Sequence, residues 1–159
     1  MEVNYLGAVN GLHFALPYLK QSRGHIVAIA SIQSKIGVPY HTGYVASKHA
    51  LEGFCRALRY DLEGTGVTVL TVHPHWIRGT NLRTNACSAD DQPVGDRKLA
   101  HTGESISTAE CSAAILKAIG NRDTELIIPA KLRFVPWLKL LWPGLLRRKI
   151  WSKINRQEN

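Results

Sequence analysis

Three short apolar runs, separated by amphipathic stretches, constrain the fold of this chain more than any other feature. The runs are rich in β-branched residues and occupy positions 25–30, 67–72 and 125–129. Runs of this kind are typical of strands buried on both faces of a sheet, and helical connections between consecutive strands make those strands parallel. The sequence therefore predicts an α/β fold with a parallel sheet and right-handed crossovers.

Amphipathic periodicity places helices between these strands. The predicted helices cover residues 4–20, 42–63 and 107–119, the last with Ser107 or Thr108 as its N-cap. The polar stretch 75–106 contains Gly and Pro and has no sustained period, so it is predicted to be a long functional loop. Three parallel strands leave one sheet edge without a neighbour, and the sheet is therefore expected to be incomplete, like the second half of a larger one.

The net charge of +8 is unevenly distributed along the 159 residues. Residues 1–130 hold 12 Lys and Arg against 11 Asp and Glu, whereas residues 131–159 hold 8 against 1. The excess positive charge therefore belongs to the tail and not to a groove in the body, which argues against a nucleic-acid partner. We predict two regions, an α/β body at 1–130 and a basic, aromatic, amphipathic tail at 131–159.

The cysteines and the first residues indicate the cellular compartment of the protein. The three cysteines are widely spaced and odd in number, which argues against a disulfide framework or a zinc site and fits a reducing cytosol. The opening residues, MEVNYLGAVN, have neither a basic leader nor a long apolar run. A cytoplasmic location is expected, and peripheral membrane contact depends on the tail.

Four polar residues stand at the ends of these predicted elements. Tyr44 and Lys48 are four positions apart, which places them on one face of the second helix, although this spacing alone is a weak signal. Ser31 directly follows the first apolar run, 13 positions before Tyr44, and Asn4 lies near the start of the first helix. The segment HPHWIRGT follows the second run, where a nucleotide lies in a doubly wound fold.

This combination resembles the short-chain dehydrogenase/reductase family over residues 1–129. The resemblance implies a Rossmann-like doubly wound parallel sheet, of which about three of seven strands are present here. It also implies a catalytic tetrad of Asn4, Ser31, Tyr44 and Lys48. The expected activity is hydride transfer between NAD or NADP and a small-molecule carbonyl or alcohol, with the choice between the two cofactors left open.

The chemistry of this reaction explains the tetrad. Hydride transfer to a carbonyl leaves an alkoxide that must receive a proton, so a positioned acid is needed. A free phenol has a pKa of about 10, and a nearby ammonium lowers it, so Tyr44 is the expected general acid and base with Lys48 as its electrostatic partner. Ser31 is expected to donate a hydrogen bond to the substrate oxygen. By resemblance, Lys48 also holds the ribose hydroxyls, and Asn4 holds a water in a proton relay.

The resemblance assigns further contacts around the tetrad. Cofactor contacts are implied for Pro74, Ile77 and Thr80 in addition to Tyr44 and Lys48. His75 stands where the family has glycine, and Thr80 falls one position late, so a strained turn is expected after the second strand.

The loop between the first strand and the second helix is the expected substrate side of the site. By resemblance, Gln33, Val38 and Tyr40 line the substrate pocket with Ser31 and Tyr44.

No metal is expected. His73 and His75 are the only paired candidates near this segment, and no third ligand clusters with them in the sequence.

The chain has no G-x-G-x-x-G or comparable glycine cluster after a strand, which is the feature that binds a pyrophosphate in this fold. Two interpretations stay open. The chain is a C-terminal portion of an oxidoreductase, or it is a truncated, non-catalytic remnant that acts as an association module with a full-length subunit. In relatives, the helices matching 4–20 and 42–63 pack against a partner subunit, which implies a homo-oligomer.

The tail holds three of the four tryptophans, Trp137, Trp142 and Trp151, interleaved with Lys and Arg. Its apolar stretch at 134–146 is about 13 residues long and is too short to span a bilayer, which needs about 20. Two interpretations stay open here as well. The tail lies at a membrane interface, which would suit a lipophilic substrate, or it docks over the substrate pocket or a partner subunit with its basic face in solvent.

Overall fold

A three-stranded parallel sheet forms the centre of the molecule. The computed structural model describes residues 1–80 and 105–158, with side chains up to residue 154. Strands β1 (His25–Ile29), β2 (Thr68–Pro74) and β5 (Glu125–Ile128) lie in the order β1-β2-β5, and both pairings are parallel. Each strand matches one of the three apolar runs, so the predicted fold class is confirmed.

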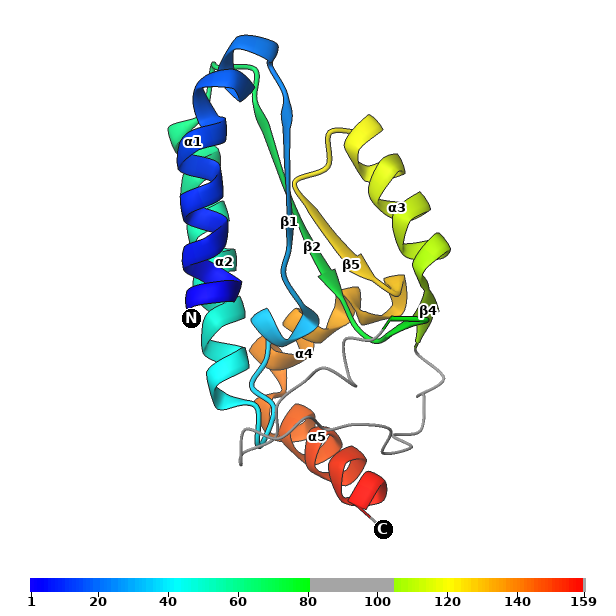
Figure 1. Ribbon diagram of the computed structural model, residues 1–159. Coiled ribbons are helices and arrows are strands. Elements are labelled where there is room, and N and C mark those ends of the chain that lie inside the picture. Colours follow the sequence, from blue (N-terminus) through cyan, green and yellow to red (C-terminus); the bar gives the residue numbers. More distant parts are fainter. Residues whose placement is uncertain (81–104, 159) are drawn as a thin grey trace.

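The helices cover the two faces of this sheet. A π-helical turn at Glu2–Leu6 leads into α1 (Gly7–Ser22), which lies beside α2 (Thr42–Asp61) on one face, and α3 (Thr108–Gly120) lies on the other (Figure 1). The predicted cap of α3 is confirmed: the Ser107 side chain accepts from the backbone of Glu110, whose carboxylate accepts from Ser107 in return.

The central strand β2 divides its side chains between the two faces, because successive residues of a strand point to opposite sides. Val69 packs with the α2 side chains Leu51, Cys55 and Leu58, together with apolar residues of α1. Leu70 and Val72 belong to the other cluster, which includes residues of α3 and β5. Thr71 and His73 alternate with Leu70 and Val72, and both carry their polar groups to the α2 face.

Strand β1 lies at the edge of the sheet and is only partly covered. It pairs with β2 alone among the described strands, and the Ile29 side chain is about half exposed. The bare sheet edge expected from three parallel strands is therefore found at β1.

A second, two-stranded sheet lies within the region predicted to be a loop. It pairs β3 (Ile77–Arg78) with β4 (Ile106–Ser107) in parallel. The rest of the predicted loop, residues 81–104, lies outside the described residues.

The C-terminal tail forms a 3-10 turn (Ala130–Phe134) and the helices α4 (Val135–Leu141) and α5 (Pro143–Glu158). These lie at the end of the sheet where the strands finish (Figure 1). The Lys139 amine donates to the Lys35 carbonyl oxygen at 2.9 Å, and the Trp151 ring meets Tyr40 edge to face. The tail therefore packs against the loop between β1 and α2. None of the described helices combines the length and the apolar composition that a bilayer crossing requires.

Candidate active site

The four predicted catalytic residues come from elements that meet at one end of the sheet. Ser31 follows β1 at its carboxyl end, Tyr44 and Lys48 lie in the first turns of α2, and Asn4 lies in the π-helical turn. The N-terminus and the start of α2 lie at the end where β1, β2 and β5 finish (Figure 1). Carboxyl ends of parallel strands are the usual place for a ligand site in a doubly wound fold.

Lys48 is a half-buried cation beside an aromatic ring. Its Nζ donates to the Ile29 carbonyl oxygen at 2.9 Å and lies 5.8 Å from the centroid of the Tyr44 ring. Burial removes water from the amine and lowers the pKa of Lys48 below its usual value. Within residues 1–80 and 105–154, its amine forms no ion pair with a carboxylate.

Asn4 contacts the same helix one residue before Lys48. Its Nδ2 donates to Ser47 Oγ at 3.1 Å, and Ser47 Oγ donates to the Tyr44 carbonyl oxygen at 2.8 Å. Ser47 is buried, so this contact fixes the π-helical turn against α2. Asn4 therefore reaches the Tyr44–Lys48 turn through Ser47.

Ser31 is held in an extended conformation by its own short helix. Its φ and ψ are −167° and 159°, and its hydroxyl oxygen accepts from the Gln33 backbone at 3.2 Å as the N-cap of the 3-10 helix Ile32–Ser34. The Ser31 carbonyl oxygen accepts from the backbone and the hydroxyl of Ser34, at 2.9 and 2.7 Å. Most of Ser31 is buried, and the hydrogen bonds from Ser34 fix its backbone.

A fully buried histidine of β2, His73, contacts both Ser34 and the backbone of Ser31. His73 Nδ1 lies 2.8 Å from Ser34 Oγ and 3.3 Å from the Ser31 carbonyl oxygen. Because the single Ser34 hydroxyl proton is donated to Ser31, the hydrogen-bond network assigns a proton to His73 Nδ1. His73 Nε2 lies 3.2 Å from a carboxylate oxygen of Glu125 on β5.

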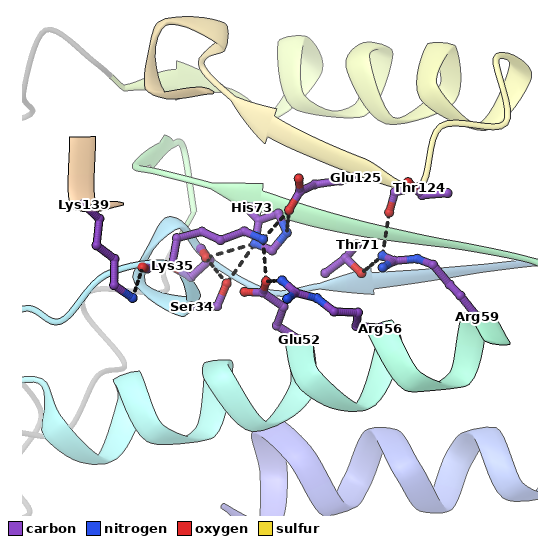
Figure 2. Close-up of polar contacts among 11 residues, drawn as sticks. Ser34, Lys35, Glu52, Arg56, Arg59, Thr71, His73, Thr124, Glu125 and Lys139 are labelled. Carbon is purple, nitrogen blue, oxygen red and sulfur yellow. Dashed lines mark hydrogen bonds and ion pairs between the residues drawn. The ribbon is translucent and has the colours of Figure 1, made fainter. Parts of the chain in front are cut away.

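A buried lysine links this histidine cluster to α2 (Figure 2). Lys35 pairs with the carboxylates of both Glu52 and Glu125, and Arg56 also pairs with Glu52 at 2.6 Å. Burial alone would raise the pKa of Glu52, but the hydrogen bond and the charge of Lys35 outweigh burial and hold that pKa below its usual value.

Glu125 completes this group. The contact with His73, acting against burial and supported by Lys35, lowers the pKa of Glu125 to about 2. We call the set of Ser34, Lys35, Glu52, His73 and Glu125 the buried network. Glu125 lies at its rim, with its side chain 45% exposed.

The buried network resembles a metal-ligand set but already contains a cation. Glu52, His73 and Glu125 offer ligand atoms within 4.8 Å of one another. The Lys35 ammonium pairs with both carboxylates and supplies the charge that a bridging metal ion would supply. The structure thus brings two carboxylates to His73 that the sequence did not reveal, and we interpret the group as an ion-pair network.

The predicted cofactor contacts follow β2. Pro74 is the last residue of β2, Ile77 opens β3, and the exposed Thr80 donates to the Ile77 carbonyl oxygen at 3.4 Å. The expectation that His75 strains this turn is wrong, because His75 is not among the residues with positive φ and its backbone donates to Ile128 at 2.9 Å. The left-handed position of this segment falls at Gly79, with φ 76°.

The predicted substrate residues lie on the loop that the tail covers. Gln33 Oε1 is 3.0 Å from His41 Nδ1, Val38 is half-buried, and Tyr40 is 74% exposed in the left-handed region, at φ 62°. An apolar groove of about 280 Å³ lies between this loop and α5; its lining includes Ile36, Pro39, Pro143, Leu146 and Ile150.

Sequence reasoning missed the buried network, although two local signals pointed to it. His73 interrupts an otherwise apolar strand run. Glu52 occupies the inward face of α2, in the same row as Cys55 and Leu58. A charged residue at a buried helical position is expected only where a partner neutralises it.

A parallel α/β sheet with polar side chains at the carboxyl ends of its strands has the architecture of doubly wound, nucleotide-binding folds. The sequence profile of the short chain dehydrogenase family matches residues 1–91. The chain belongs to the short-chain dehydrogenase/reductase family.

Individual relatives agree with this assignment. The mouse dehydrogenase/reductase SDR family member 7B is 35% identical over 162 residues, covering 99% of this chain and 49% of that protein. Its Xenopus laevis counterpart is 36% identical over 147 residues, covering 91% and 45%. The chain therefore spans about half the length of the relatives it matches.

Solved structures show the same fold at lower identity. A short-chain dehydrogenase from Burkholderia cenocepacia in complex with NADP superposes with a TM-score of 0.75 at 23% identity, covering 94% of this chain and 56% of that one. One from Burkholderia phymatum in complex with NAD gives 0.68 at 21% identity, covering 90% and 57%.

Proposed function

We propose that this chain carries the proton-transfer end of an NAD- or NADP-dependent oxidoreductase site acting on a carbonyl or alcohol. The observation that carries the proposal is the Lys48 amine, which is desolvated, lacks a carboxylate in the described part of the chain and lies beside the Tyr44 ring. Because no described carboxylate neutralises this amine, its charge acts on a ligand and on the phenol next to it.

The residues act in defined roles. Tyr44 gives its phenolic proton to the substrate oxygen during reduction and removes it during oxidation. Lys48 favours the phenolate form of Tyr44 through its charge. Ser31, with its backbone fixed by Ser34 and His73, directs its hydroxyl to the substrate oxygen. Asn4 positions the turn of α2 through Ser47 and takes part in the proton relay to Lys48.

The same residues fit the nicotinamide end of the cofactor. Lys48 has donors left for ribose hydroxyls, and Pro74 and Ile77 lie at the end of β2, where the ring would lie. No described strand of this chain is followed by a glycine-rich loop, so the fit covers the nicotinamide end alone. When bound, NAD or NADP supplies or accepts the hydride. The NADP and NAD complexes of the two Burkholderia enzymes support this cofactor class.

The substrate class follows from the groove beside the predicted pocket residues. Its apolar lining, shared by loop 36–39 and α5, favours a lipophilic carbonyl or alcohol.

Titration of NADH and NADPH against the purified chain at millimolar concentration tests the proposal. Cofactor binding is expected to be lost in Lys48→Met. It is expected to persist in Lys20→Met, which removes an exposed lysine of α1. Turnover of a panel of aldehydes and ketones is expected to fall by about 10²–10⁴-fold with Tyr44→Phe. Cofactor binding that is absent, or that is unchanged in Lys48→Met, would overturn the proposal.

A second function, as an association module, is favoured by exposed aromatic residues. Phe14 and Tyr18 on α1 and Tyr60 on α2 are each about three-quarters exposed. We propose that α1 and α2 form the contact with a second copy or with a full-length subunit. Sedimentation equilibrium is expected to show a dimer that Phe14→Glu with Tyr18→Glu dissociates. A dimer together with no cofactor binding would favour the association module over the enzyme.

A further inference from the structure

The C-terminal helices pack against the body along one side and leave an apolar face in solvent. Leu146 is buried, and Lys139 bonds to the Lys35 carbonyl, so the tail is anchored. We call the exposed apolar residues on its other side the tail face: Phe134, Trp137, Leu140, Leu141, Trp142 and Leu145.

The tail face is continuous along α4. Phe134, Trp137 and Leu140 are 74%, 63% and 72% exposed. At 100° per residue, these three and Leu141 fall within an arc of about 120°, whereas Val135 lies about 160° and Leu138 about 100° from the centre of that arc, and both are half-buried. One side of α4 therefore packs inward and the other presents only large apolar groups to solvent.

Lysines and arginines lie before and after the tail face in the sequence. Between Ala130 and Gln157 the sequence contains no Asp or Glu. The flanking lysines and arginines are all exposed: Lys131, Arg133, Arg147, Arg148, Lys149 and Lys153. A protein partner that buried the apolar residues would have to pair or bury these cations as well, whereas an anionic lipid surface accepts both groups at once.

We propose that the tail face binds the surface of an anionic membrane. Trp137 and Trp142 enter the headgroup region together with the leucines, and the flanking cations contact lipid phosphates. The contact is peripheral, because no described helix is long and apolar enough to cross a bilayer. This surface is distinct from the one that carries the proposed oxidoreductase function, and it stands whether or not the chain binds NAD or NADP.

Vesicle flotation of the full 159-residue chain tests this surface. Phosphatidylcholine vesicles with phosphatidylserine are expected to bind the chain, and phosphatidylcholine vesicles alone to bind it at least about tenfold more weakly. Binding to the anionic vesicles is expected to weaken as salt is raised.

Two pairs of variants separate the apolar and the charged contributions. Trp137→Ala with Leu140→Ala is expected to weaken partitioning by about tenfold. Arg148→Glu with Lys149→Glu is expected to weaken it by more than about tenfold, since each lysine or arginine near an anionic surface is worth about fivefold.

Matched changes elsewhere control for composition and net charge. Phe14→Ala with Tyr18→Ala removes exposed aromatics from α1, and Lys20→Glu with Lys117→Glu makes the same change in net charge away from the tail. Both controls are expected to leave partitioning within about twofold, and circular dichroism confirms that each variant is folded.

Fluorescence quenching by brominated lipids gives a readout that does not depend on a loss of binding. Trp137→Phe with Trp142→Phe is expected to retain flotation and to lose most of the quenching. No flotation at low salt would overturn the proposal, as would equal weakening by the control pairs. It would also be overturned by a concentration-dependent dimer that the tail variants dissociate without any vesicle binding, since the tail face would then be an interface between copies.

Discussion

Lys35 and Lys48 lie near the same end of the sheet but have opposite electrostatic surroundings. The Lys35 side chain is 10% exposed, and its amine is shared by the carboxylates of Glu52 and of Glu125, which is 45% exposed. Lys48 is half-buried, and its described contacts are one backbone carbonyl oxygen and the Tyr44 ring. Burial opposes the charged form of a lysine in either place, but among the residues that the structure describes, anions offset this effect at Lys35 and not at Lys48.

The two lysines differ in whether their charge supports the fold or is available to a ligand. A cation shared by two carboxylates is part of the folding free energy, because its removal leaves Glu52 with the exposed Arg56 alone and Glu125 with His73 alone among their described partners. A desolvated cation without an anion contributes little to folding and is available for a ligand. Stability measurements on four groups test this contrast, from the largest expected effect to the smallest.

Lys35→Met is expected to lower the free energy of unfolding by about 3 kcal/mol, because Glu52 and Glu125 would then face each other with His73 between them. Urea denaturation followed by circular dichroism measures the change. Lys117→Met, at an exposed position on α3, is the control and is expected to stay within about 0.5 kcal/mol of the parent. A loss below about 1 kcal/mol for Lys35→Met would mean that the pairing of Lys35 does not support the fold.

Acid titration is expected to expose the Glu125 contribution. The pKa of Glu125 is lowered from 4.5 to about 2. As the pH falls, Glu125 is therefore protonated at a lower pH in the folded state than in the unfolded state. The stabilisation by Glu125 is therefore complete above pH 4.5 and is lost as the pH falls toward 2. Glu52, whose pKa is also lowered, adds to the same acid limb.

The variant Glu125→Gln separates this contribution from the general effect of acid. Its free energy of unfolding is expected to be lower near neutral pH and to fall less steeply below pH 4.5 than that of the parent. Parallel acid limbs for the two proteins, measured by urea denaturation at a series of pH values, would contradict the assignment.

Arg56→Ala is expected to lower the free energy of unfolding by only about 0.3–0.5 kcal/mol. Arg56 binds the same Glu52 carboxylate as Lys35, but its side chain is 63% exposed and water screens the pair. The effect is expected to disappear in high salt, in contrast to that of Lys35→Met. A loss as large as that of Lys35→Met would remove the distinction between buried and exposed partners of Glu52.

The sequence predicted most of the fold because its signals are local. Apolar runs located β1, β2 and β5, and the Ser107 cap located the start of α3. The bare edge at β1 followed from the number of parallel strands.

The polar contacts were predicted less well, because they join elements far apart in sequence. Lys35, Glu52, His73 and Glu125 come from four segments, and no spacing rule connects them before the sheet order is known. The expectation of strain at His75 was wrong for a related reason. The left-handed residue of this segment is Gly79, which only the backbone conformation reveals.

Lys48→Met is expected to have the smallest effect on folding, within about 0.5 kcal/mol of the parent. The substitution keeps the length of the side chain and removes a charge that desolvation opposes. The Ile29 carbonyl oxygen that loses its donor lies at a partly exposed position where water can replace it. If NADH or NADPH binding is lost in a variant whose urea midpoint is unchanged, Lys48 serves the ligand and Lys35 serves the fold. A large loss of stability in Lys48→Met would instead make both lysines structural.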